Sequence, residues 1–150
     1  MTKKTVAPEL SRPLQIDRVP RKGSHERVVA DASECALLAK RFSIHALHKL
    51  SALLLATPWR GGGVKVTGSV EVDVELVSVV SLEIFSARRT FKVERYFLPA
   101  NKLEPNEEVD ADPVHDGVID LGEIVAETVG LELDPYPRLP GETFAESENN

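Results

Sequence analysis

Histidine and serine side chains, which could form a metal or catalytic site, are scattered through this sequence rather than grouped. His45 and His48 have a spacing that could place two imidazoles on one face of a helix, but no third metal ligand accompanies them. Ser24 is the sequence neighbour of His25, whereas a catalytic triad is defined by its geometry in space. The sequence therefore predicts no catalytic residue, no bound metal and no cofactor, and it favours a protein that is not an enzyme.

Glycines and carboxylates give two further motifs that fall short of a known site. The glycines at 61–63 lack the Gly-Lys-Ser/Thr ending of a phosphate loop and precede a strand pattern, so they indicate a hairpin turn. The carboxylates between residues 104 and 116 lack the spacing and the glycine of a calcium loop. Cys35 is the only cysteine, which excludes an intramolecular disulfide and a site with several thiolate ligands.

Charge is distributed unevenly along the 150 residues, whose net charge is −6. Residues 1–60 carry 11 Lys and Arg against 5 Asp and Glu, whereas residues 104–150 carry 1 against 14. Two interpretations remain open. The basic part can face a polyanion such as a nucleic acid, or the two parts can attract each other and keep the protein soluble.

Six basic residues form the candidate nucleic-acid-binding surface. Four of them fall on or around one expected β-turn, so their side chains are expected to project from the same end of a sheet, and the other two close the first expected helix. Because aromatic residues are few, we expect shape-tolerant contact rather than base-specific reading of a single strand. The turn residues are Arg18, Arg21, Lys22 and Arg27, and the helix residues are Lys40 and Arg41.

Two helices are predicted from their start signals. Asp31 and Glu34 have the capping-box spacing, and the apolar stripe that follows ends at Phe42. Asp120 and Glu123 repeat that spacing. The second box is flanked by Ile119 and Ile124, at the positions of a hydrophobic staple, and Gly130 is expected to close this helix.

The longest strand pattern runs over residues 64–85, where apolar residues occupy even positions and polar residues the first odd ones. At about 3.3 Å per residue this run exceeds a normal strand, so it must bend or break, and Gly68 and Ser78 are the expected places. Apolar residues on both sides from Val77 onward predict that this part is covered on both faces. A turn at 86–89 and a return strand through 91–97 are expected to follow.

Shorter strands are expected at 13–19, 26–30 and 47–57, the last pairing across the glycine turn. These elements predict an α+β fold, namely a strongly curled antiparallel sheet of five to six strands with about two packed helices. The expected organisation is a flexible tail at 1–10, one domain at 11–140 with an acidic loop at 101–117, and a flexible tail at 141–150. Since the sequence contains neither a signal peptide nor a membrane span, we expect a cytoplasmic protein.

Four stretches of the chain form a recognisable series together with Pro140-Gly141, namely residues 66–74 (VTGSVEVDV), 78–83 (SVVSLE), 119–127 (IDLGEIVAE) and 133–138 (LDPYPR). Taken in their order, they resemble the YceD family of large-ribosomal-RNA-subunit accumulation proteins, with the alphaproteobacterial branch as the nearest. The resemblance covers residues 10–144. Many members carry Cys-x-x-Cys where this chain has Ser78 and Ser81, so no thiol or metal role is transferred here. Both serines are instead expected in a dry pocket with their hydroxyls bonded to backbone.

The resemblance implies a non-catalytic ribosome-biogenesis factor that supports the accumulation, processing or stability of large-subunit (23S) ribosomal RNA. The implied partner is that RNA or a precursor particle, and no membrane. An alternative is a protein-binding module whose acidic segment escorts a basic ribosomal protein. An enzyme is a distant third reading. The sequence does not predict an oligomeric state.

Overall fold

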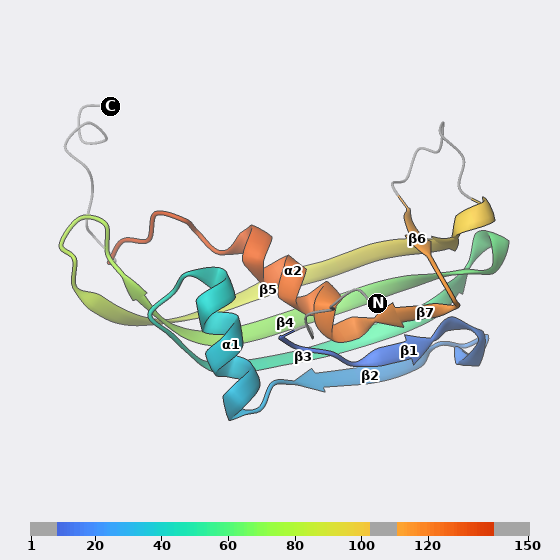
Figure 1. Ribbon diagram of the computed structural model, residues 1–150, viewed down its shortest axis with the longest axis horizontal. Coiled ribbons are helices and arrows are strands. Elements are labelled where there is room, and N and C mark those ends of the chain that lie inside the picture. Colours follow the sequence, from blue (N-terminus) through green and yellow to red (C-terminus); the bar gives the residue numbers. More distant parts are fainter. Residues whose placement is uncertain (1–8, 103–110, 140–150) are drawn as a thin grey trace, which may run out of the picture.

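The computed structural model describes residues 9–102 and 111–139 (Figure 1). Five strands form one sheet in the order β2-β3-β4-β5-β6, and two short strands form a separate ribbon, β1-β7. Both helices and the ribbon lie on one face of the sheet, where they share a single hydrophobic core with it. The bounds are β1 Pro13–Gln15, β2 Ser24–Val29, α1 Ala32–Phe42, β3 Ala46–Trp59, β4 Gly63–Val77, β5 Ile84–Pro99, β6 Asp112–Val114, β7 Val118–Asp120 and α2 Leu121–Glu132.

The expected alternation is confirmed in β4, whose even side chains line the core. Val64, Val66 and Val70 are fully buried, whereas Ser69 on the opposite face is exposed. Strand β4 pairs antiparallel with β3 on one side and with β5 on the other. The sheet therefore has an inner face under the helices and an outer face that carries mostly polar side chains.

The 22-residue alternating run is broken by a hairpin at 78–83, so the strong curl expected from it is not confirmed and the sheet stays open. Strand β4 continues through Gly68, and the expected turn at 86–89 is wrong, since these residues pair with β4 inside β5. The side chains at this hairpin are exposed, so the expectation that both faces are covered from Val77 onward is wrong. Val77 is 39% exposed, as solvent rather than protein covers its outer side.

The acidic stretch 101–117 contains more regular structure than expected. A short 3-10 turn (η3, Ala100–Lys102) follows β5, and β6 then pairs parallel with the end of β5, so the sheet is not wholly antiparallel. Residues 103–110 lie outside the described residues. The expected strand at 13–19 is split into β1, paired only with β7, and a 3-10 turn (η1, Ile16–Arg18).

Helix α1 begins as predicted. The Asp31 carboxylate accepts a hydrogen bond from Glu34 N at 2.8 Å, and the Glu34 carboxylate accepts one from Asp31 N at 2.9 Å, which completes the capping box. Cys35 of this helix faces the core and is buried, and its burial raises the pKa of the thiol. A protonated, enclosed thiol of this kind packs as a small apolar side chain.

Helix α2 begins at the predicted residue, but its capping box is incomplete. Asp120 accepts hydrogen bonds from Gly122 N and Glu123 N at 2.9 and 3.2 Å. The Glu123 carboxylate is engaged by Arg41 of α1 at 2.8 Å and does not return to the cap. Gly130 lies inside the helix, which continues to Glu132, so the expected end is wrong by two residues. A Cβ at Gly130 would be 3.5 Å from the ring of Phe42, so this position lies against α1.

Asp120→Ala is expected to lower the free energy of unfolding by about 2–4 kcal/mol, more than loss of an ordinary cap. The Asp120 carboxylate also accepts from Arg12 N and Ser11 Oγ, both at 2.7 Å, so it ties the N-terminal segment to α2. Urea unfolding followed by circular dichroism measures the change. Asp120→Asn keeps one acceptor oxygen and should lose about half as much. Equal losses in the two variants would contradict this assignment of the bonds.

Candidate nucleic-acid interface

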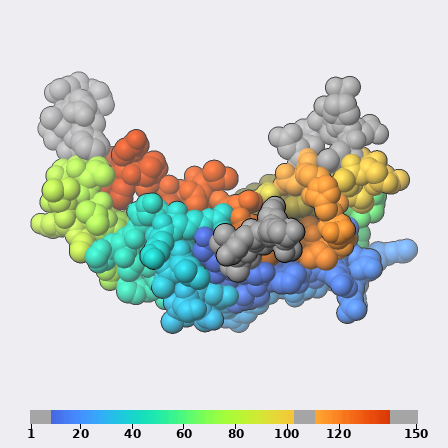
Figure 2. All heavy atoms as spheres, viewed as in Figure 1, coloured from blue at the N-terminus to red at the C-terminus, as the bar shows by residue number. Residues whose placement is uncertain are grey.

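Three of the six predicted basic residues lie together at one end of the sheet. Arg18 ends the 3-10 turn η1, and Arg21 and Lys22 occupy the following turn, which is closed by a bond from Gly23 N to Pro20 O at 2.9 Å. All three side chains are exposed, and none forms an ion pair with another described residue. In Figure 2 this segment, coloured blue, projects at the right-hand end of the molecule.

Arg27 lies farther along the same edge of the sheet. It stands on β2 opposite Leu53 of β3, about 10 Å along the strand from Ser24, and its side chain is exposed on the outer face. Leu53 is 63% exposed beside it. Arg27 therefore lies along the same edge as Arg18, Arg21 and Lys22 without belonging to their turn.

Lys40 and Arg41 do not extend this surface, which corrects the sequence-based expectation. They end α1, and α1 leads into the start of β3, whereas the other end of β3 lies beside η1 and the basic turn that follows it (Figure 1). The 14 residues of β3 span about 45 Å between these ends. The hydrogen bond to Glu123 raises the pKa of Arg41, whose guanidinium also pairs with Glu9 at 3.1 Å. Arg41 holds α1, α2 and the N-terminal segment together.

Further basic and aromatic side chains lie at this end of the sheet, on the β3–β4 hairpin and on β5. The guanidinium of Arg60 lies 4.5 Å from the centre of the Trp59 ring, and the ammonium of Lys65 lies 5.6 Å from the centre of the Tyr96 ring. The rings of Trp59 and Tyr96 are 4.9 Å apart, although the residues come from β3 and β5. Lys102 in η3 lies beside the same hairpin.

Sequence reasoning missed this aromatic and basic group. One signal was available, because Trp59-Arg60 directly precedes the glycine turn and Lys65 follows it, which puts them at the same hairpin. The position of Tyr96 depends on its pairing with Lys65, a register that no local pattern shows. We define the basic end as Arg18, Arg21, Lys22, Arg60, Lys65 and Lys102.

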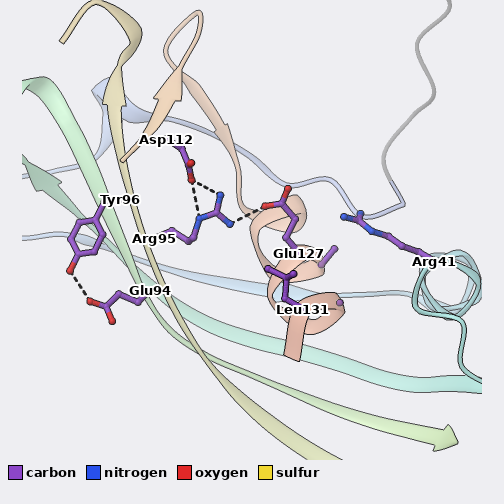
Figure 3. Close-up of a pocket in the computed structure, with 9 residues that line it drawn as sticks. Arg41, Glu94, Arg95, Tyr96, Asp112, Glu127 and Leu131 are labelled. Atoms are coloured by element: carbon purple, nitrogen blue, oxygen red, sulfur yellow. Dashed lines mark hydrogen bonds and ion pairs between the residues drawn. The ribbon is translucent and has the colours of Figure 1, made fainter. Parts of the chain in front are cut away.

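A separate groove of about 630 Å³ lies between β5, β6 and α2 (Figure 3). Arg95 lies at its centre and donates to the Asp112 carboxylate at 2.6 and 3.1 Å and to Glu127 at 2.9 Å. The Tyr96 hydroxyl donates to Glu94 at 2.7 Å. Since two carboxylates offset its charge, Arg95 fastens β6 to α2 and is poorly placed to bind a phosphate.

The two serines that stand in place of the family's cysteine pair have different surroundings. Ser78 is fully buried, and its hydroxyl oxygen accepts hydrogen bonds from Val80 N and Ser81 N, both at 3.1 Å. Ser81 is exposed, so the dry pocket expected for both serines is wrong for Ser81, although its hydroxyl accepts a longer bond from Glu83 N at 3.4 Å. Within the described ranges, no group of three or more His, Cys, Asp or Glu could hold a metal ion.

The chain matches one known family over its central and C-terminal parts. The family model described as large ribosomal RNA subunit accumulation protein YceD matches residues 66–149, which include most of β4, all of β5 and α2. No curated protein and no solved structure matches the chain. No helix in the described part of the chain is long and apolar enough to cross a membrane.

Proposed function

We propose that this chain, which belongs to the YceD family of large ribosomal RNA subunit accumulation proteins, binds large-subunit ribosomal RNA, or the precursor particle that contains it, in the cytoplasm. The family description connects the chain with accumulation of this RNA. The basic end supplies the physical basis for direct contact. In this proposal the protein is a binding factor and performs no reaction on the RNA.

The exposed charges of Arg18, Arg21 and Lys22 carry this proposal. Arg18, Arg21 and Lys22 are neighbours, and like charges this close repel one another. Phosphates would relieve the repulsion and release counterions from the RNA, which favours binding. Some exposed cations elsewhere on the sheet face carboxylates, as Arg88 does at 2.8 Å from Asp73. Arg18, Arg21 and Lys22 form no such pair with a described residue, and three adjacent exposed cations of this kind suit a polyanion.

Binding of the full chain to large-subunit ribosomal RNA is expected to fall steeply with salt. If three to five cations of the basic end contact phosphates, the logarithm of the affinity should fall against the logarithm of KCl concentration with a slope of about −3 to −4.5. Fluorescence anisotropy with a labelled structured fragment of that RNA, measured between 50 and 300 mM KCl, gives this slope. A slope near zero would contradict phosphate contact.

A protein-escort function is the second candidate, and one observation favours it. The hairpin between β4 and β5, at the opposite end of the sheet from the basic end, exposes apolar side chains, with Leu82 at 76% and Ile84 at 53%. Exposed apolar groups of this size are typical of protein contacts. Co-sedimentation with precursor particles before and after RNase treatment separates the two functions. RNA binding predicts loss of the protein from the particle after RNase, whereas an escort stays with its ribosomal protein.

A further inference from the structure

We infer that the RNA continues from the basic end onto the outer face of the sheet as an unpaired segment, where Arg27, Lys65 and Lys92 hold its phosphates around an exposed leucine. This inference rests on the proposed function, because it names the form of RNA that is bound and the surface that binds it. The surface lies on the other side of the sheet from both helices.

One row of side chains across four paired strands is exposed on the outer face. The row runs from β2 through β3 and β4 to β5 and consists of Arg27, Leu53, Ser69 and Lys92. The residue that follows each of them in its strand is buried, so all four side chains point away from the core. Both helices and the β1–β7 ribbon share the core on the inner face, so this row stays open to solvent in the described part of the chain (Figure 1).

Cations flank an apolar centre on this face. Arg27 and Lys92 lie at the two ends of the row, about 14 Å apart at three strand spacings. Leu53 lies between them and is 63% exposed. Lys65 is on the same face of β4, about 13 Å nearer the basic end, and none of the three cations forms an ion pair with another described residue. We call Arg27, Leu53, Lys65 and Lys92 the outer cationic surface.

Carboxylates mark the end of the outer cationic surface toward the β4–β5 hairpin. Glu71 and Asp73 occupy the next rows there, and they pair with Lys49 at 3.3 Å and with Arg88 at 2.8 Å. These cations are already matched, so a phosphate gains little from that half of the face. Positive charge in excess is therefore confined to the half of the outer face that adjoins the basic end.

Glu94 is the carboxylate that lies closest in the chain to Lys92 on this face. It stands between Lys92 and Tyr96 on β5, and it accepts a hydrogen bond from the Tyr96 hydroxyl at 2.7 Å. One carboxylate beside Arg27, Lys65 and Lys92 reduces the positive charge of the outer cationic surface without cancelling it.

Two packed aromatic rings join the outer cationic surface to the basic end. The Trp59 ring packs against Tyr96 and lies under the Arg60 guanidinium at 4.5 Å, and Tyr96 faces Lys65 across β4 and β5. These rings support the two cations. From Trp59 to Leu53 the outer face extends about 20 Å along β3, so a strand bound at the basic end can pass over Arg60 and Lys65 to the exposed row.

An unpaired segment fits this surface better than a stem does. A stem presents phosphates and ribose hydroxyls to a protein, and neither favours contact with an exposed leucine. An unpaired segment also presents the flat faces of its bases, which can cover Leu53 while the phosphates reach Arg27 and Lys92. Leu53 has no hydrogen-bonding group that could read a base edge. We therefore expect a preference for single-stranded RNA with little dependence on its sequence.

Two matched substitutions test this surface, since both replace an exposed leucine or isoleucine on the outer face by glutamate. Leu53→Glu puts a carboxylate at the centre of the outer cationic surface, whereas Ile84→Glu puts one at the opposite end of the face, where Ile84 is 53% exposed. For a single strand of about 12 nucleotides, Leu53→Glu should weaken binding about ten-fold or more at 100 mM KCl. Ile84→Glu should change it less than about two-fold. Melting curves check that both variants are folded.

A thiol footprint shows where the RNA lies. Cys35 is the only cysteine and is buried, so Leu53→Cys and Ile84→Cys each add one accessible thiol. The bound single strand is expected to slow alkylation by iodoacetamide about five-fold at position 53 and to leave position 84 unchanged. A duplex of the same length should bind through the basic end and leave both thiols accessible.

The outcomes separate this inference from the proposed function. If the single strand binds with the expected salt dependence, but the two glutamate variants bind equally and neither thiol is protected, the outer cationic surface is wrong and the basic end stands. If neither RNA binds at 50 mM KCl, the proposed RNA contact itself fails. Equal protection of position 53 by duplex and single strand would overturn the assignment to unpaired RNA.

Discussion

Replacement of Arg18, Arg21, Lys22 and Arg27 by glutamine is expected to weaken binding to large-subunit ribosomal RNA about 10²- to 10⁴-fold at 100 mM KCl. Each lost phosphate contact removes about one counterion-release step, so the salt slope should become shallower by about 0.9 for each of the four residues that contacts a phosphate. The substitutions should leave the fold intact, because the side chains are exposed and none forms an ion pair with another described residue. Anisotropy titrations and co-sedimentation with precursor particles measure the effect.

The matched control neutralises four cations away from the basic end, namely Lys40, Lys49, Arg88 and Arg89. It changes the net charge by the same amount, so it separates the position of the charges from their number. This variant should retain affinity within about three-fold. If the two variants lose affinity equally, binding follows the overall charge, and the basic end has no special role.

Gly68→Ala is expected to destabilise the protein by about 3–5 kcal/mol, a large effect for a single methyl group. A Cβ at Gly68 would lie 2.1 Å from the carbonyl oxygen of Leu53 and 2.9 Å from Leu54 Cα, so β3 and β4 would have to separate. The residue also has a φ of +153°, which side-chain-bearing residues rarely adopt. Equilibrium urea unfolding gives the free energy directly.

Gly117→Ala is the control for the backbone conformation alone. Gly117 has a φ of +70°, but a Cβ there would meet nothing within 4 Å. It should therefore cost about 1–2 kcal/mol, from the left-handed conformation without a clash. A loss at Gly68 no larger than that at Gly117 would mean that the sheet can relax around the added methyl group.

The parts of the fold that sequence predicts well are set by neighbours in the chain. The start of α1 at Asp31 and the start of α2 at Asp120 follow from short-range capping bonds, and the inner face of β4 follows from alternation. The hairpin at the glycine turn was predicted for the same reason. Each of these features needs only a few consecutive residues to be defined.

The fold expectations that are wrong concern segments whose hydrophobic pattern does not match the solvent exposure of their side chains or whose pairing has no local signal. Val79 and Val80 continue the apolar pattern of β4, but they lie in an exposed turn whose conformation depends on the buried hydroxyl of Ser78. The parallel pairing of β6 with β5 has no local signal, since three residues are too few for a pattern. Hydrophobic periodicity does not distinguish a covered surface from an exposed one.

The candidate site was predicted only in part for a related reason. The cluster of Arg18, Arg21 and Lys22 is contiguous in the chain and was predicted. Arg41 was assigned to the same surface because its partner Glu123 is 82 residues away, and a sequence does not show such an ion pair. Trp59 and Tyr96 lie far apart in the chain, and only the registers of three strands bring their rings together.

The β1–β7 ribbon has a consequence for the order in which the chain assembles. Strands β3, β4 and β5 pair through consecutive hairpins, so they can form as soon as they are available, at a small cost in loop closure. Strand β1 is synthesised before them, but its partner is β7, and the bond from Arg12 N to Asp120 spans 108 residues. During synthesis β1 therefore remains unpaired until β7 and almost the whole domain have left the ribosome. The hydrogen bond from Ile16 N to Gly117 O at 2.9 Å, which joins η1 to the turn between β6 and β7, consequently forms last, when the two ends of the domain meet.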